Sequence, residues 1–288
     1  MSNALSYMGQ ITRRQDRDRF LCTLFAPADM REGHYVLLAF NAELAKIREM
    51  VSEPLLGEIR LQWWRDIIKK IYSNPAVEID DHAVVIELAK VIRKYNLSRG
   101  LFDKLINARS RDMIDEPPND EAELRNYAAA TASTLNALLM EISSPFEKTS
   151  AGLELTAAEH IGVAWSLAGI LRASSLFAKY KRVYVPQSLM QEGGFDAYVF
   201  MEQKPTAPIK MAVKKIIEFA DAEIMQARAL TQNKADKPIR AIFFQASLAE
   251  MYLNRIKRLD YNPFDPRIEG GRPWRQLRLS LMAVRGSF

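Results

Sequence analysis

A helix-length run with almost no polar stripe, from His160 to Leu171, constrains the fold most strongly. It reads HIGVAWSLAGIL and is apolar on nearly every side when wound as an α-helix. A helix that is apolar all round is a buried helix, and this run is too short to span a bilayer. We therefore expect it at the centre of a helical protein. Arg172 follows directly, and a charge at the end of a buried helix needs a partner or water.

The rest of the chain shows helical periodicity and no strand-like alternation. Nearly half of the 288 residues are hydrophobic, which is ample for a large core, and glycine and proline are sparse. We expect one all-α domain over residues 1–288, with roughly ten helices packed around a central cavity. The expected helices lie near residues 13–20, 35–50, 55–72, 80–95, 101–114, 124–142, 160–171, 208–228, 238–259 and 273–284.

Cysteine, histidine and targeting signals exclude several classes of protein. Cys22 is the one cysteine, so we expect neither a disulfide framework nor a cysteine-based metal site, and it reads as a small core residue. His34, His82 and His160 lie far apart with no ligand spacing. The first residues lack the pattern of a signal or transit peptide, and no segment reaches transmembrane length. A reducing, cytoplasmic location is expected.

The charge balance is mildly basic, with a formal net charge of +5. The tail contributes much of the excess through Arg267, Arg272, Arg275, Arg278 and Arg285. We favour a solvated face. The alternatives are an acidic partner or an anionic membrane surface, which would place the protein at the periphery of the inner membrane. Nucleic acid is not expected as a partner, because no binding motif accompanies the charge.

Three acids before a proline pair are a candidate metal site. Asp112, Asp115 and Glu116 fall at i, i+3 and i+4, so they would share one face of a helix. Such a face could hold Mg²⁺ together with a phosphate ligand. The acids also stand just before Pro117-Pro118, where carboxylates commonly mark a solvated helix end. We favour the solvated helix end.

Two helix starts carry capping signals. Asp120 with Glu123 three residues later, and Thr156 with Glu159, both match the spacing of a capping box. The first pair predicts the start of the 124–142 helix, and the second predicts the start of the buried central helix.

Four stretches resemble motifs of the squalene/phytoene synthase family, whose members are all-helical and join two prenyl diphosphates head to head. The stretches are Ala39–Glu49, at the first aspartate-rich motif; Tyr127–Ser133, similar to the Tyr-Cys-x-x-Val-Ala-Gly helix; Ile170–Pro186, similar to the second aspartate-rich helix and its Gly-Arg-x-Tyr-x-Pro exit; and Asn262–Leu281, similar to the C-terminal end. The resemblance covers nearly the whole chain and implies an isoprenoid-synthase-like helical bundle.

The carboxylates that this family uses to hold Mg²⁺ are largely replaced. The first motif reads Ala45-Lys46-x-x-Glu49 where Asp-Asp-x-x-Asp is expected. The second reads Ala173-x-x-x-Phe177 after its arginine, where Asp-x-x-x-Asp is expected. Ionisation of an allylic diphosphate needs its leaving charge neutralised by Mg²⁺, which requires oxygen ligands. The resemblance therefore implies a site with no catalytic residue, no metal and no cofactor.

The resemblance places a degenerate substrate site at a defined set of positions. These are Ala45, Lys46, Glu49, Tyr127, Arg172, Ala173, Phe177, Arg182 and Tyr184. We expect the helices that carry Ala45 and Ala173 to face one another across the core. Because Arg172 lacks its neighbouring carboxylate, we expect it either to pair with an acid, Glu49 being the leading candidate, or to face water. Tyr184 should lie close to the same site.

A narrower resemblance points to one branch of the family. The run from Ala39 to Ile47 and the triplet Gln62-Trp63-Trp64 resemble a branch that includes a mitochondrial respiratory complex I assembly factor and its bacterial relatives. That branch is thought to lack prenyl transfer. It implies a non-catalytic protein that acts in respiratory-complex assembly, with a respiratory-complex subunit as partner.

Two other functions stay open from the sequence. One is a carrier that binds an isoprenoid or lipid without converting it. The other is an active head-to-head prenyltransferase that uses Mg²⁺ held by displaced acids. The candidate acids are Glu43, Glu49, Asp112 and Glu116. Glu43 and Glu49 are six residues apart and would point to different helix faces, which argues against a relocated first motif.

Overall fold

The computed structural model describes residues 5–73, 82–143, 151–270 and 274–288, and every regular element within these ranges is helical. The α-helices are α1 (Tyr7–Gln15), α2 (Arg17–Thr23), α3 (Ala28–Lys46), α4 (Pro54–Ser73), α5 (Ala83–Tyr95), α6 (Arg99–Ala108), α7 (Glu121–Ala128), α8 (Thr134–Ser143), α9 (Ala151–Arg172), α10 (Ser174–Lys179), α11 (Gln187–Glu192), α12 (Ala197–Met201), α13 (Ala207–Thr231), α14 (Arg240–Arg258) and α15 (Trp274–Arg285). Short 3-10 segments are η1 (Ile47–Met50), η2 (Arg109–Met113) and η4 (Pro266–Ile268), and η3 (Ala129–Ser133) is a π-helical turn.

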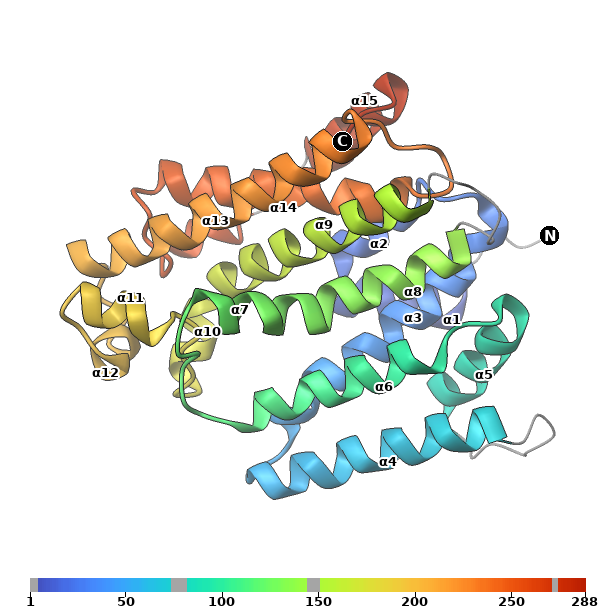
Figure 1. Ribbon diagram of the computed structural model, residues 1–288, viewed down its shortest axis with the longest axis horizontal. Helices are drawn as coiled ribbons and strands as arrows, with labels where there is room; N and C mark the ends of the chain where they lie inside the picture. Colours follow the sequence, from blue (N-terminus) through green and yellow to red (C-terminus); the bar gives the residue numbers. More distant parts are fainter. Residues whose placement is uncertain (1–4, 74–81, 144–150, 271–273) are drawn as a thin grey trace.

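The long helices form one bundle with α9 at its centre, as the apolar pattern predicted. Figure 1 shows α9 between α8 on one side and the α13–α14 pair on the other, with α4 at the outer edge. Helices α8, α13 and α14 all contact α9. Ile161, Ala164 and Leu167 have no exposed surface. The arrangement confirms the all-α expectation and explains why no side of α9 carries a polar stripe.

Small and polar residues let α9 approach its neighbours closely. A Cβ added to Gly162 would lie 2.5 Å from the Cα of Ser133, so a larger residue there would force α9 away from η3. The Asn136 amide on α8 donates a hydrogen bond of 3.0 Å to the Ala158 carbonyl on α9. The Gln245 amide on α14 donates in turn to the Asn136 side-chain oxygen, at 2.9 Å. These buried hydrogen bonds fix the spacing of α8, α9 and α14.

Several helix boundaries differ from the sequence-based expectation. Helix α9 begins at Ala151, and Thr156 lies inside it with its hydroxyl donating to the Gly152 carbonyl, so the predicted Thr156 cap is wrong. The predicted Asp120 cap is confirmed, since the Glu123 N–H donates to the Asp120 carboxylate at 2.8 Å. The expected 124–142 helix is interrupted by the η3 turn. Helix α1 begins at Tyr7, six residues before the expected start of the first helix.

The start of the chain is also divided differently. Asp16 separates α1 from α2 inside the expected 13–20 helix, because its carboxylate caps α2 by accepting from the Arg19 N–H at 3.2 Å. Cys22 on α2 is fully buried, as expected of a small core residue. No described helix combines the length and the hydropathy needed to cross a membrane.

His34 joins α3 to α8 inside the core. Its Nε2 lies 3.0 Å from the Ser143 hydroxyl, and its Nδ1 is buried without a partner. Burial lowers the pKa of His34 to about 4, so the ring is neutral at physiological pH. It is therefore a neutral core histidine with one of its two ring nitrogens paired, which agrees with the absence of ligand spacing in the sequence.

Candidate functional site

The carboxylate of Asp18 on α2 is the centre of one buried polar cluster. The Tyr252 hydroxyl on α14 donates to it at 2.6 Å, and the Arg172 guanidinium at the end of α9 lies 3.2 Å away. Arg275 on α15 forms a second ion pair with the same carboxylate. Glu269 pairs with Arg172 from the solvent side at 2.9 Å. We call these five residues the Asp18 cluster.

The charged groups of the Asp18 cluster pair with one another. The Arg172 guanidinium stacks on the Tyr252 ring, 3.6 Å from the ring centroid. Burial disfavours the charged guanidinium, but the hydrogen bond to Glu269 and the charge of Asp18 outweigh this effect and raise the pKa of Arg172. Burial also raises the pKa of the Tyr252 hydroxyl, which therefore stays protonated and donates. The cluster joins α2, α9, α14 and α15.

A polar pocket of about 780 Å³ opens beside the Asp18 cluster. Its lining residues are Arg14, Gln15, Asp16, Arg17, Asp18, Leu21, Trp165, Arg172, Glu269, Arg275 and Gln276. Arginines and carboxylates of this lining neutralise one another in part, and Arg14 and Arg17 at its edge are exposed. The pocket therefore offers a polar, weakly cationic surface.

The Asp18 cluster corrects the expected partner of Arg172. Arg172 does pair with acids, but they are Asp18 and Glu269, whereas Glu49 is exposed in η1 and is not a partner of Arg172. The contact between α2 and α14 carries Asp18 to the end of α9. Nothing in the local sequence signals this approach, because Asp18 stands in a charged run that reads as a solvated helix start.

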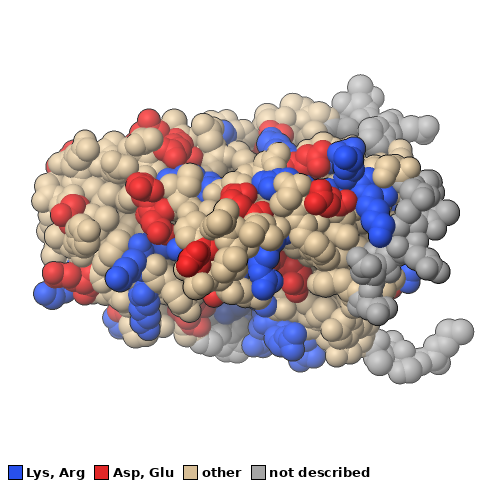
Figure 2. All heavy atoms as spheres, turned by 90° about the horizontal axis from the view of Figure 1, so that it is seen from below, with Lys and Arg blue, Asp and Glu red and all other residues tan. Residues whose placement is uncertain are grey.

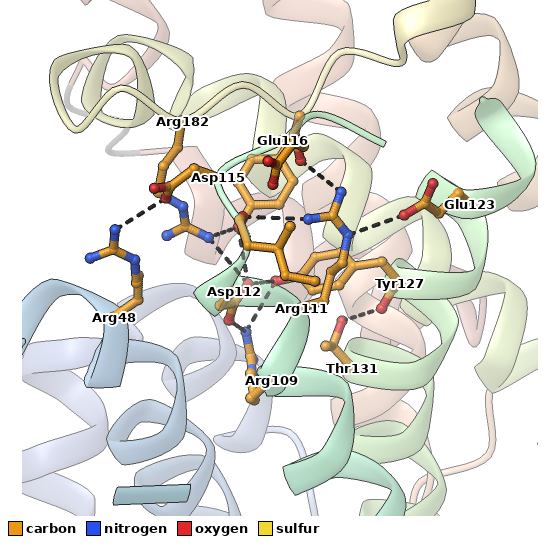
Figure 3. Close-up of polar contacts among 12 residues, drawn as sticks. Arg48, Arg109, Arg111, Asp112, Asp115, Glu116, Glu123, Tyr127, Thr131 and Arg182 are labelled. Atoms are coloured by element: carbon orange, nitrogen blue, oxygen red, sulfur yellow. Dashed lines mark hydrogen bonds and ion pairs between the residues drawn. The ribbon is translucent and has the colours of Figure 1, made fainter. Parts of the chain in front are cut away.

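A second buried polar cluster surrounds Asp112, which is 4% exposed (Figure 3). The hydroxyls of Tyr127 and Tyr184 donate to its Oδ1 at 2.6 and 3.0 Å. The guanidinium groups of Arg109 and Arg182 each lie 3.3 Å from its carboxylate oxygens. Arg182 also contacts the Tyr184 hydroxyl. We call these five residues the Asp112 cluster.

The tyrosines and arginines of the Asp112 cluster keep fixed protonation states. Burial raises the pKa of both Tyr127 and Tyr184, so both hydroxyls stay protonated and act as donors. Burial opposes the charge of Arg109, but the neighbouring tyrosines and Asp112 outweigh it and raise the pKa of that guanidinium. The cluster therefore surrounds the Asp112 carboxylate with hydroxyl and guanidinium donors.

The three acids near the proline pair do not share one helical face. The helix tightens into η2 at Arg109–Met113 and ends there, so Asp112 points inward while Asp115 and Glu116 are exposed beyond the end. Asp115 pairs with Arg48 at 3.1 Å. The favoured solvated helix end is thus wrong for Asp112 and right for the other two acids. Among the described residues, no group of three His, Cys, Asp or Glu side chains is placed to hold a metal ion.

The remaining positions of the expected site lie at one end of the bundle. Ala45 and Lys46 end α3 and are half-buried, and Ala173 separates α9 from α10. The C-terminal ends of α3 and α9 lie at the same end in Figure 1, and both helices pack on α8. The Phe177 ring lies 4.8 Å from the Tyr184 ring, between centroids.

Tyr184 and Arg172 belong to different clusters, so the expectation that they share one site is wrong. Arg182 and Tyr184 follow α10, and the chain turns there so that both side chains meet Asp112. Arg172 ends α9 and points instead to α2 and α15. The sequence-based site thus divides into two clusters. Sequence reasoning missed five participants. Asp18, Tyr252, Glu269 and Arg275 come from elements distant in the sequence, and Arg109 lies in η2 itself, three residues before Asp112.

The architecture is that of the isoprenoid synthases, as solved structures show. The squalene synthase HpnC from Alicyclobacillus acidocaldarius superposes with a TM-score of 0.75 at 19% identity, covering 89% of this chain and 94% of that chain. A dehydrosqualene synthase in complex with a ligand gives a TM-score of 0.78 at 14% identity, covering 97% and 94%. At these identities the likeness shows the fold.

The chain belongs to the squalene/phytoene synthase family, whose sequence model matches residues 12–282. It is 31% identical over 264 residues to the Bos taurus protein named NADH dehydrogenase (ubiquinone) complex I, assembly factor 6, covering 91% of this chain and 77% of that protein. The Homo sapiens protein of the same name is 29% identical over 264 residues, which again cover 91% of this chain and 77% of that protein. Phytoene synthase 2, chloroplastic, of Solanum lycopersicum is 21% identical, covering 99% of this chain and 91% of that protein.

Proposed function

We propose that this chain is a family member that does not join prenyl diphosphates and that acts in the assembly of respiratory complex I, with a subunit of that complex as partner. The observation that carries the proposal is the pattern of identity. The chain is 31% identical to the Bos taurus assembly factor over most of its length and only 21% identical to a phytoene synthase over nearly all of it.

The residues at the aspartate-rich positions support a site without Mg²⁺. Ala45, Ala173 and Phe177 provide no side-chain oxygen, whereas Mg²⁺ prefers a near-octahedral set of oxygen ligands. The aromatic ring of Phe177 packs on Tyr184 and fills its position with apolar surface. Without a metal to neutralise the departing diphosphate, the largest electrostatic contribution to its ionisation is missing.

The buried acids of the described chain are already committed to ion pairs. Asp18 is held by Arg172 and Arg275, and Asp112 by Arg109 and Arg182. A carboxylate that neutralises two guanidinium groups is not available to a divalent cation, because metal binding would leave the guanidinium groups buried without a counter-charge. We therefore assign both clusters a structural role, in which their ion pairs hold the ends of neighbouring helices together.

The alternative of a prenyltransferase with displaced acids gains no support from the placement of those acids. Asp112 is enclosed by its cluster, Glu43 is half-buried on α3, and Glu49 and Glu116 are exposed. No group of three acids among the described residues converges on a metal position. A carrier of an isoprenoid or lipid is compatible with the same site, and it differs from the assembly role only in what is bound.

Deletion of the gene in its own host tests the assembly role. The amount of fully assembled complex I, measured on native gels by its NADH dehydrogenase activity, should fall strongly and return when the wild-type gene is restored. The amounts of the other respiratory complexes serve as the internal control. Unchanged complex I in the deletion strain would rule the assembly role out.

A further inference from the structure

The C-terminal helix α15 exposes a row of aliphatic side chains. Leu277, Leu281 and Val284 are 49%, 49% and 87% exposed, and their spacing of i, i+4 and i+7 places them on one side of the helix. Leu279 on another side is fully buried and fixes α15 to the body of the protein. The helix is thus held on the surface with an apolar stripe turned outward.

The charge around this stripe has one sign. Residues 271–288 contain four arginines and no aspartate, glutamate or lysine. Arg275 and Arg278 pair with Asp18 and Glu250 on neighbouring helices. Arg285 is exposed, and in the described part of the chain it forms no ion pair with an aspartate or glutamate side chain. The end of α15 therefore keeps an uncompensated positive charge beside its apolar stripe.

Neighbouring segments add cations at both ends of α15. At the first end, Arg14 and Arg17 are exposed and line the same pocket as Gln276. At the second end, the Ala235 N–H donates to the carbonyl of residue 286 at 3.1 Å, which brings exposed Lys234 and Lys237 to the end of the helix. Asp236 is the one acid in that turn. The acids at the first end, Asp16, Asp18 and Glu269, already pair with Arg19, Arg172 and Arg275, so both ends keep cations without an ion-pair partner among the described residues.

We propose that the outer side of α15 docks on the surface of an anionic phospholipid bilayer. The aliphatic stripe would enter the boundary between headgroups and acyl chains, where an amphipathic helix lies in the membrane plane. The flanking arginines and lysines would lie over the anionic headgroups, and each cation near such a surface strengthens binding several-fold. Lipid binding by α15 and its neighbouring cations does not depend on the proposed role in complex I assembly.

The charge around α15 distinguishes it from the other exposed apolar surface and makes an anionic lipid bilayer the matching partner. Helix α4 also exposes apolar side chains, including Leu55, Ile59 and Trp63. Figure 2 views the molecule from the α4 side and shows acidic and basic side chains interspersed over that surface. A surface with acidic and basic side chains in balance does not complement the negative charge of such a membrane. Only the α15 side, within the described residues, combines an exposed aliphatic stripe with an excess of free cations at both ends.

Co-sedimentation of the full chain with lipid vesicles tests the proposal. Vesicles of phosphatidylcholine in which part of the lipid is replaced by phosphatidylglycerol should bind the protein, and pure phosphatidylcholine vesicles should bind it at least roughly tenfold more weakly. A triple variant, Leu277→Ser, Leu281→Ser and Val284→Ser, should lose at least about tenfold of this binding. A double variant, Lys234→Glu with Lys237→Glu, should lose about tenfold and reduce the dependence on salt concentration.

A matched variant on the opposite side controls for general loss of exposed apolar surface. Leu55→Ser with Ile59→Ser removes comparably exposed aliphatic side chains from α4 and should leave vesicle binding unchanged. All substituted residues are exposed, so melting temperatures without vesicles should match the wild type.

Three outcomes would overturn the proposal. The first is equal binding to neutral and anionic vesicles, and the second is full binding by the triple variant. The third is a dimer in solution that the triple variant converts to a monomer, because a second copy would then cover the stripe.

Discussion

Replacing Asp112 with alanine is expected to lower the free energy of unfolding by about 3–5 kcal/mol, because it leaves two buried guanidinium groups without a counter-charge. Arg109 and Arg182 both lie against this carboxylate, and the hydroxyls of Tyr127 and Tyr184 would lose their acceptor. Buried donors without acceptors add to the loss. Urea unfolding followed by circular dichroism measures the effect as a lower transition midpoint.

Asp115 supplies the matched control, since it lies three residues away and also pairs with an arginine. Its side chain is 58% exposed where it meets Arg48, and exposed ion pairs contribute less than about 1 kcal/mol. Asp115→Ala should therefore change the midpoint little. Equal losses in the two variants would contradict a buried stabilising role for Asp112.

The second large effect is expected for Asp18→Ala, again about 3–5 kcal/mol of unfolding free energy. Asp18 is 5% exposed and compensates both Arg172 and Arg275, and it accepts from Tyr252. Its removal should loosen α2 and α15 from the end of α9. The melting temperature should fall by several degrees or more.

A Glu269 variant distinguishes the stability contributed by the buried partner of Arg172 from that contributed by its exposed partner. It pairs with the same Arg172, but its side chain is 57% exposed. Glu269→Ala should therefore cost less than about 1 kcal/mol. Equal destabilisation by Glu269→Ala and Asp18→Ala would contradict this account. It would mean that the exposed partner of Arg172 contributes as much stability as the buried Asp18.

The central part of the fold could be predicted from the sequence because it depends on local pattern. The run from His160 to Leu171 lacks a polar stripe, and α9 is indeed enclosed by α8, α13 and α14. The Asp120 cap is a contact between residues three apart, so spacing alone predicted it. The motif resemblance extended these local inferences to the whole architecture.

The pairing within the site could not be predicted, because it depends on helices far apart in the sequence. Arg172 meets Asp18 and Arg275 only after α2, α14 and α15 have packed around the end of α9. The burial of Asp112 depends on the tightening of α6 into η2, which ends the helical periodicity on which the shared acidic face was based. A charged run and an acidic helix end read as solvated until their distant partners are known.

The claim that this chain has kept the isoprenoid-synthase fold without prenyl transfer is tested most directly by a product assay. The purified chain is incubated with farnesyl or geranylgeranyl diphosphate, Mg²⁺ and NADPH, and the extract is analysed by mass spectrometry beside an active synthase of the same family. We predict no squalene-like or phytoene-like product above the level of a reaction without protein. A Mg²⁺-dependent, head-to-head condensed product from the wild-type chain would contradict the account.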